Sequence, residues 1–586
     1  MPTLGFLPER GGRRSEAEVL AEARRLHNVT LVNGLDQVAD SSAPAQAEAI
    51  RPAWRAAAPA ASWRLRLREG ERLAWTTFPV PAALETKRVV LVFAIAMGNG
   101  SPLPEPGGQF DLLLDGQKLL SFRLVKHTET WRKGDAGLCL NVRRLDAARP
   151  GEAIHVDPSS VESFVAFGYG LLQLPASQVK PGQPVRLAIV PRAPIPSNRW
   201  LQIDRDPHLL ETGTFQEGLD RVCHWAARWR VGEYTLLFGD LHSHSGLGRD
   251  GDGSGSGTGT PRENFLYARD VANLDLYALT DHDYEFASSA DWELRSSLAQ
   301  EFYKPGEFVT FPAFEWSSER FGHRGVYYEE PDPPYFMADR AGDPWSPLND
   351  NPNELWRKLG ELQTGSLTIP FHPALARNPM VWDYRHPKLE PVAEVYSCLG
   401  SAEGPNGAFA AETVPGCDLR AALAAGARVG FIASSNSHDG HPGDSQGGRS
   451  TAYYHARGSG RLAVYAKEFN RTGVLEALRA RRVYATTGEP IFLDFRLNDH
   501  RMGSELRADQ VGRAPQLLVH ALGTCEIHMI QILCNGRVVG IQFGDGVEEG
   551  IAILDSSFSA AQPRVYYARV VQRDGETAWS SPIWVG

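Results

Sequence analysis

Between residues 233 and 487, short apolar segments alternate with longer stretches of helical periodicity, and this alternation limits the folds open to the chain. The apolar segments cover residues 235–238, 274–279, 308–311, 367–369, 393–396 and 429–433. Such alternation predicts βα units that build a parallel sheet or a barrel. In these folds, ligand-binding residues gather at the C-terminal ends of the strands.

The regions on either side of this segment have a different residue pattern, with β-type apolar runs and few helical stretches. With 586 residues, the chain exceeds the size of a single core, and we expect about two to four domains. Residues 62–210 and 488–586 contain β-type apolar runs punctuated by turn signals, which predict an N-terminal and a C-terminal β-sandwich. Residues 1–61 are predicted to hold one amphipathic helix and a linker, and 211–232 a connecting segment. The predicted fold class is therefore α/β, with residues 233–487 flanked by two sandwiches.

Composition narrows the range of partners. The chain is 42% hydrophobic and 22% charged, which is typical of a globular protein and argues against disorder of the whole chain. The formal net charge of -10 and the lack of a long basic run argue against a nucleic-acid partner.

No apolar span approaches the length of a membrane helix, and the first residues do not resemble a signal peptide, so we expect a cytoplasmic protein. The six cysteines form no CxxC pair and are expected to be buried thiols.

Histidines and carboxylates follow the predicted strands of the central segment. His242 and His244 are two residues apart on an extended segment, so both side chains should point to the same side. Other strand ends add further groups: His282 and Asp283, Glu315 with His323, His372, and finally Asn436, His438 and Asp439. One such residue alone could be a core histidine or a helix cap. Five strand ends in a row favour a metal site, and imidazole with carboxylate suits zinc, manganese or iron better than calcium.

The motif order resembles that of a known superfamily. Asp-Leu-His-Ser-His, Thr-Asp-His-Asp, an isolated Glu, His-Pro and Ser-x-His occur in the same order in the polymerase and histidinol phosphatase (PHP) superfamily. The segments 394–397, 481–488 and 579–584 look like an uncharacterised branch of PHP-like proteins with flanking β domains. The resemblance implies a distorted (β/α)7 barrel, two or three divalent metal ions at one mouth, and hydrolysis of a small-molecule substrate.

The resemblance also assigns ligands. His242 and His244 would hold a first ion, Glu315 would bridge it to a second, and His323 and His372 would complete that second site. A third ion would take His282, His438 and Asp250, where many members have a histidine. Asn436 stands where the family has an aspartate that ligates the first ion. An amide oxygen is a weaker ligand than a carboxylate, so the first site is expected to bind its ion less tightly.

Further roles follow from position. Glu315 is expected to be catalytic through its bridging place, and Arg324 either neutralises charge on a phosphoryl oxygen or pairs with a surface carboxylate. Asp283 either orients an imidazole and moves a proton, or caps a helix. The remaining expected substrate contacts are His441, Arg449 and Tyr396. The glycine-rich run 246–261 is expected to be a mobile lid that carries Asp250.

Three functional hypotheses remain open at this point. The leading one is a metal-dependent phosphoesterase acting on a small phosphorylated molecule. The second keeps the metal ions but cleaves an ester, a lactone, an amide or a C–O bond of a saccharide or aromatic compound. The third is a degenerate barrel that serves as a binding module, and Asn436 is its only support. The sequence leaves the oligomeric state open.

Overall fold

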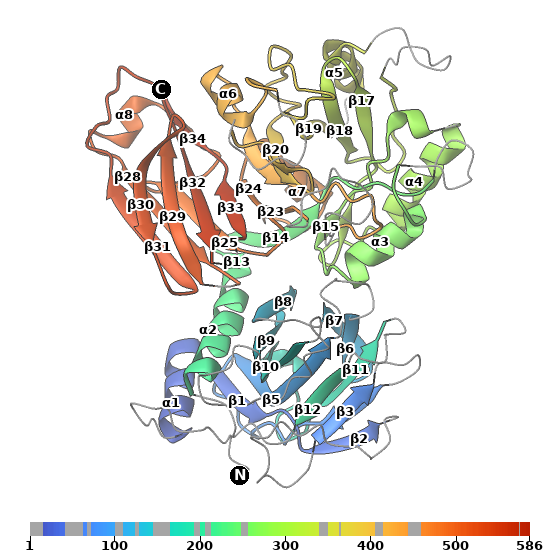
Figure 1. Ribbon diagram of the computed structural model, residues 1–586, viewed down its shortest axis with the longest axis vertical. Coiled ribbons are helices and arrows are strands. Elements are labelled where there is room, and N and C mark those ends of the chain that lie inside the picture. Colours follow the sequence, from blue (N-terminus) through green and yellow to red (C-terminus); the bar gives the residue numbers. More distant parts are fainter. Residues whose placement is uncertain are drawn as a thin grey trace. The chain divides into compact units, whose positions relative to one another are not determined.

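The computed structural model describes residues 16–41, 62–66, 72–99, 109–123, 128–144, 164–192, 200–204, 212–247, 256–286, 288–338, 350–362, 365–404, 414–443, 459–524, 526–573 and 575–586. The chain divides into two compact units, Met1–Trp229 and Arg230–Gly586. Their elements are labelled in Figure 1. The architecture is mixed α/β, with strands distributed over several sheets.

The first unit contains two sheets that share one core. The seven-stranded sheet holds β1 (Val29–Asn33), β3 (Ser62–Arg66), β5 (Arg88–Asn99), β8 (Glu129–Lys133), β9 (Ala136–Arg144), β10 (Phe164–Pro175) and β12 (Trp200–Asp204). The five-stranded sheet holds β2 (Gln37–Ser41), β4 (Leu73–Thr76), β6 (Gln109–Leu114), β7 (Gln117–Arg123) and β11 (Arg186–Pro191). The short 3-10 helix η2 (Ala176–Gln178) follows β10. The expected N-terminal sandwich therefore also includes β1 and β2, which precede residue 62.

Strand β5 shows how this unit forms two hydrophobic layers. Its side chains alternate between the faces of the sheet, as the pleat requires. Leu91 and Phe93 pack between the two sheets. Val90 and Val92 instead pack, on the other face, with residues of α1 (Glu16–His27) and α2 (Thr212–Arg228). The amphipathic helix expected over residues 15–27 is α1.

The second unit begins with the βα segment. Its largest sheet has twelve strands: β13 (Arg230–Val231), β14 (Tyr234–Asp240), β15 (Leu276–Tyr277), β16 (Val309–Thr310), β23 (Arg461–Ala466), β24 (Val483–Thr486), β27 (Glu505–Leu506), β29 (Ile527–Cys534), β30 (Arg537–Phe543), β32 (Arg564–Gln572), β33 (Thr577–Ser580) and β34 (Ile583–Val585). Strands β14, β15 and β16 pair in parallel, as the alternation predicts. Strand β23 joins the other side of β14 in antiparallel orientation.

Two three-stranded sheets complete the central segment. One holds β17 (Ala313–Ser318), β18 (Gly322–Tyr328) and β19 (Ser366–Pro370), and the other holds β20 (Val392–Ser397), β21 (Gly400–Ser401) and β22 (Gly430–Ala433). The first sheet is antiparallel throughout, whereas β20 and β22 are parallel. The connection from β17 to β18 is too short for a parallel crossover, which needs a dozen residues or more. Among the described residues, backbone pairing thus gives separate sheets and does not close a barrel.

The C-terminal strands are not separated from the central sheet. A four-stranded sheet holds β25 (Phe492–Leu497), β26 (His500–Arg501), β28 (Gln516–Leu522) and β31 (Glu548–Leu554). Strand β33, however, pairs with β24, so the twelve-stranded sheet continues past residue 487. Buried residues of β20 and β22 share a core with Trp579 and Trp584.

The helices of the second unit are short. They are α3 (Pro261–Asp270), α4 (Ser289–Phe302), α5 (Pro352–Glu361), α6 (Leu419–Ala424), α7 (Arg471–Arg479) and α8 (Ala508–Val511), with the 3-10 helix η3 (Asp283–Glu285). Thr260 caps α3 with a capping box, and Asn470 caps α7. In the described parts of the chain, no helix is both long and apolar enough to cross a membrane.

Candidate metal centre

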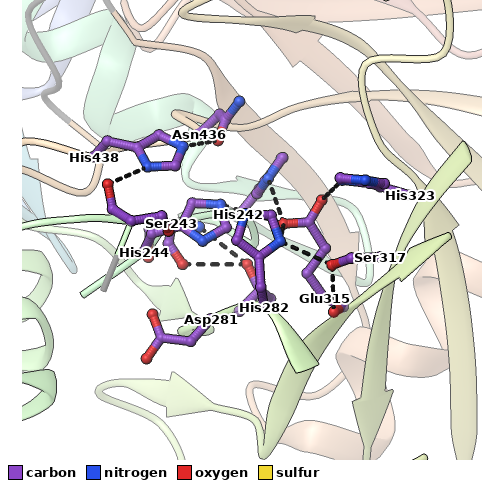
Figure 2. A network of polar contacts seen from close by, with 12 residues as sticks. His242, Ser243, His244, Asp281, His282, Glu315, Ser317, His323, Asn436 and His438 are labelled. Atoms are coloured by element: carbon purple, nitrogen blue, oxygen red, sulfur yellow. Dashed lines mark hydrogen bonds and ion pairs between the residues drawn. The ribbon is translucent and has the colours of Figure 1, made fainter. Parts of the chain in front are cut away.

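The strand ends bring the predicted imidazoles to one buried carboxylate, Glu315 of β17 (Figure 2). His242 Nε2 and His244 Nε2 lie 3.7 and 3.4 Å from Glu315 Oε2, so the two histidines of the His-x-His segment do face the same side. The segment is fixed by pairing with the last motif, because the His244 backbone N–H donates to the Ser437 carbonyl at 2.8 Å. The side chains of His242, His244 and Glu315 form one group of candidate metal ligands.

A second group meets the same carboxylate. His323 lies on β18, next to β17 in the antiparallel hairpin, and its Nδ1 is 2.7 Å from Glu315 Oε1. His282 Nδ1 lies 3.0 Å from Glu315 Oε2. His372 Nε2 is 3.7 Å from Glu315 Oε1. Glu315 is therefore shared by the two groups of candidate ligands, and its role as a bridging ligand stays a prediction.

Within the described residues, His282 and His438 are not in one group of candidate ligands, and Asp250, the residue expected to join them at a third ion, lies outside those residues. His282 lies with Glu315 and His323. The His438 ring stacks on that of His244 at 4.2 Å, and its Nε2 is 3.1 Å from Asn436 Oδ1. Its Nδ1 donates to the Ser256 carbonyl at 2.9 Å. Asn436 thus contacts His438 and has a positive φ of 48°, a backbone conformation that asparagine tolerates better than most residues.

The donor atoms fit a divalent cation. His242 Nε2 and Glu315 Oε2 are buried and have no hydrogen-bond partner among the described residues. A buried polar atom without a partner costs roughly 1–3 kcal/mol, and more when the group is charged. A cation between the groups would satisfy both atoms, and a set of histidines with one carboxylate suits zinc, manganese or iron.

The electrostatics of the cluster agree with this fit. Burial raises the pKa of Glu315, but the charges of the neighbouring His282 and His323 outweigh burial and hold this pKa well below its usual range. Burial lowers the pKa of His323 and of His438 to about 4. Burial lowers the pKa of His242, but the charges of Glu394 and Glu315 and the hydrogen bond that the imidazole Nδ1–H donates to Glu394 outweigh burial and raise this pKa to about 9. Glu315 is therefore ionised at neutral pH, whereas the rings of His323 and His438 are neutral.

Arg324 lies beside His323 in sequence but not in space. Neighbouring residues of a strand point to opposite faces of the sheet. The Arg324 Nε donates to Glu390 Oε2 at 2.8 Å, and its Nη1 donates to the Phe321 carbonyl at 2.8 Å. Arg324 and Glu390 are both buried. Arg324 therefore pairs with a buried carboxylate and not with the surface carboxylate that the sequence left open as its partner. The expected action of Arg324 on a phosphoryl oxygen stays a prediction.

The other expected contacts have varied surroundings. Asp283 is buried in η3, where its Oδ2 accepts from the Ala338 backbone N–H at 2.5 Å, and burial raises its pKa to about 7. The His441 ring lies 4.7 Å from that of Tyr267. Tyr396 is buried and stacks on Trp579 of β33, so it packs in the core of this unit. Two further expected residues, Asp250 and Arg449, lie outside the described residues.

Sequence reasoning did not single out the residues that hold the candidate ligands in place. Ser317 Oγ is 2.8 Å from His282 Nδ1, and Asn378 Nδ2 is 2.6 Å from His323 Nε2. Glu394 Oε2 is 2.9 Å from His242 Nδ1. The one available signal was a carboxylate inside an apolar strand, at Glu394. Asp240, two residues before His242, is buried, and its two oxygens accept hydrogen bonds from the backbones of His242, Ser435 and Gly443 and from the Ser435 hydroxyl.

Comparison with known proteins gives a partial picture. A family described as a protein of unknown function, DUF3604, matches residues 272–398, which include Glu315 and Glu394. An uncharacterised protein of Chlamydia pneumoniae is 28% identical over 345 residues, covering 54% of this chain and 53% of the relative. One from Chlamydia muridarum is 29% identical over 252 residues, covering 37% and 38%. The chain thus matches about half, or less, of the length of these curated relatives.

A solved structure also shows limited similarity. It is a two-domain protein from Bacteroides vulgatus, described as containing a predicted PHP-like metal-dependent phosphoesterase. The match has 14% sequence identity and a TM-score of 0.31, and covers 60% of this chain and 96% of that chain.

Proposed function

We propose that the chain is a metal-dependent hydrolase, and that it is a phosphoesterase acting on a small phosphorylated molecule. The observation that carries the proposal is the convergence of two imidazole groups on the buried carboxylate of Glu315. The motif order of the PHP superfamily, with its distorted (β/α)7 barrel, supports a phosphate ester as the substrate.

Each residue of the candidate metal centre has a proposed role. His242, His244 and Glu315 would hold one divalent ion, and Glu315, His282 and His323 a second. Such ions, when bound, supply an acid centre that activates water and polarises the bond to be cleaved. Oε2 of Glu315 faces His242, His244 and His282, and Oε1 faces His323, so this one carboxylate would contact both ions. Ser317 orients the ring of His282, and Asn378 orients that of His323.

A second candidate substrate follows from two arginines. Arg324, which follows His323 in the sequence, forms an ion pair with Glu390. Arg295 forms an ion pair with Asp281, the residue that precedes His282. Guanidinium groups that are already paired are poor partners for a phosphoryl group. This favours, as the second candidate, an ester, a lactone or an amide with little charge at the bond that is cleaved.

An activity panel separates the two candidates. The protein would be loaded with manganese or zinc, its metal content verified, and assayed on phosphomonoesters, phosphodiesters, carboxyl esters and lactones, with Glu315→Gln as the matched inactive variant. Turnover of a phosphate ester that Glu315→Gln abolishes is the expected result. Turnover of carboxyl esters or lactones alone would replace the first candidate by the second. With metal verified, no turnover of any of these substrates would contradict the proposal.

A further inference from the structure

Glu394 joins two segments of the metal centre with one carboxylate. It lies on β20 and is buried. Its Oε2 is 2.9 Å from His242 Nδ1, and its Oε1 accepts the backbone N–H of His372 at 3.0 Å. The pairing of β20 with β22 is irregular between Glu394 and Tyr396. An irregularity of this kind re-aims a side chain of the strand.

The His242 ring is held in two ways. It stacks on Phe371 with 3.5 Å between ring centroids and 6° between ring planes, which fixes the plane of the imidazole. The contact with Glu394 fixes the rotation within that plane, because Nδ1 must face the carboxylate. In the neutral ring that a metal ligand requires, Nδ1–H donates to Glu394 and the opposite nitrogen, Nε2, carries the lone pair on the side of Glu315.

His372 depends on the same carboxylate through its backbone. Its φ is 30°, in the left-handed region that non-glycine residues rarely adopt. Such a conformation persists only where the surroundings hold it in place. The hydrogen bond from its N–H to Glu394 is such a restraint, and it brings His372 Nε2 to 3.7 Å from Glu315 Oε1.

The electrostatic setting of Glu394 differs from that of Glu390 and Glu403, two other buried carboxylates of this unit. Glu390 pairs with Arg324, and Glu403 pairs with Arg420 and Arg569. Within the described residues, the ion-pair partner of Glu394 is the imidazole of His242. A buried carboxylate held by an imidazole and a backbone N–H is costly for folding. The arrangement is better explained by what it does for the two histidines.

We propose that Glu394 is a positioning residue that fixes His242 and His372 toward the two oxygens of Glu315, and so links a ligand of the first group to the neighbouring imidazole of His372. The inference rests on the proposed function, since it assumes that these groups bind divalent ions. Carboxylates that orient metal-ligating histidines change metal affinity by roughly 10- to 100-fold when they are removed.

The test measures metal binding rather than catalysis. Cobalt(II) would be titrated into metal-free full-length protein, with calorimetry and visible absorption as readouts. The variants are Glu394→Gln, which can accept from only one of the two donors through its single oxygen, and Glu394→Asp, which keeps the charge but is one methylene shorter. Glu403→Gln is the matched control, since it alters a buried carboxylate of the same unit that contacts other residues.

We expect at least about tenfold weaker cobalt binding and a changed visible spectrum in both Glu394 variants. The Glu403→Gln control should lose thermal stability and keep the affinity and the spectrum. If Glu394→Gln does not fold, Glu394→Asp gives the same comparison. Wild-type affinity and spectrum in a folded Glu394 variant would overturn the inference while leaving the proposed function intact. A wild-type protein that binds no cobalt would overturn both.

Discussion

The carboxylate of Glu403 links the central segment to the C-terminal strands, and its removal should lower stability by a measurable amount. Its Oε1 accepts from Arg420 Nη2 at 2.9 Å and from the Tyr567 hydroxyl at 2.7 Å. Its Oε2 accepts from Arg569 Nη1 at 2.7 Å and from Trp579 Nε1 at 2.9 Å. Glu403→Gln keeps the size of the side chain but leaves two donors facing an amide NH2.

The magnitude follows from these four bonds. Buried hydrogen bonds to a charged group contribute roughly 1.5–3 kcal/mol each, and breaking a buried ion pair costs roughly 3–5 kcal/mol. Both arginines are partly exposed, at 32% for Arg420 and 24% for Arg569, so solvent weakens their share. We expect a loss of about 3 kcal/mol. The unfolding entropy is roughly 2.1 cal/mol/K per residue, so this loss should lower the melting temperature of the unit Arg230–Gly586 by about 4 °C.

The same loss should depend on pH. Burial raises the pKa of Glu403, but Arg569 and the hydrogen bonds from Trp579 and Tyr567 outweigh it, so the folded pKa lies below the ordinary value of 4.5. A group with a depressed folded pKa contributes stability that is present above its unfolded pKa and is lost as pH falls through the folded one. The difference between wild type and Glu403→Gln should therefore be full at pH 7 and shrink below pH 4.5.

Calorimetric melting of metal-free protein at pH 7 and at lower pH values tests this reasoning. Asp509→Asn, which disrupts an exposed pair with Arg507, is the matched control and should leave the melting temperature unchanged. Equal melting temperatures for wild type and Glu403→Gln at pH 7 would refute the assigned role. So would a difference that stays constant as the pH falls below 4.5.

Three further predictions concern the metal centre. A Cβ on Gly257 would lie 2.3 Å from the His244 carbonyl oxygen, so Gly257→Ala should displace the His244 segment and lower the affinity for cobalt. Gly360→Ala is the control, because nothing lies within 4 Å of a Cβ at that position, and it should leave the affinity unchanged. Divalent metal at 100 times its Kd should stabilise the protein by about 2.7 kcal/mol, measured as a rise in Tm that a chelator reverses. An equal Tm with and without metal would count against the site. His438→Ala leaves both groups around Glu315 intact, so elemental analysis should show a loss of no more than one ion per chain.

Local patterns predicted much of the site. The period of two in an extended segment places His242 and His244 on one side, and both face Glu315. The six predicted strands of the central segment all correspond to observed strands, although β15 and β16 are shorter than their apolar runs. The reason is that strand periodicity and strand-end chemistry are properties of a few consecutive residues, which a sequence displays directly.

Features that depend on distant contacts could not be predicted. The alternation of side chains along β18 directs Arg324 toward Glu390, which is 66 residues away in the sequence. The continuation of the sheet from β24 to β33 joins residues about 95 positions apart, so the sequence pattern suggested a boundary at residue 488. Glu394 could be found only when its two hydrogen-bond partners, which are far from it in sequence, were seen beside it.

The central claim is that the imidazoles around Glu315 bind divalent metal ions. Elemental analysis of the purified protein, after loading with manganese or zinc and removal of excess metal, tests it most directly, with His242→Ala as the control. The account predicts two or three ions per chain in the wild type and a clear loss in the variant. Less than one ion per chain in a folded wild-type protein, or equal metal content in the two proteins, would contradict it.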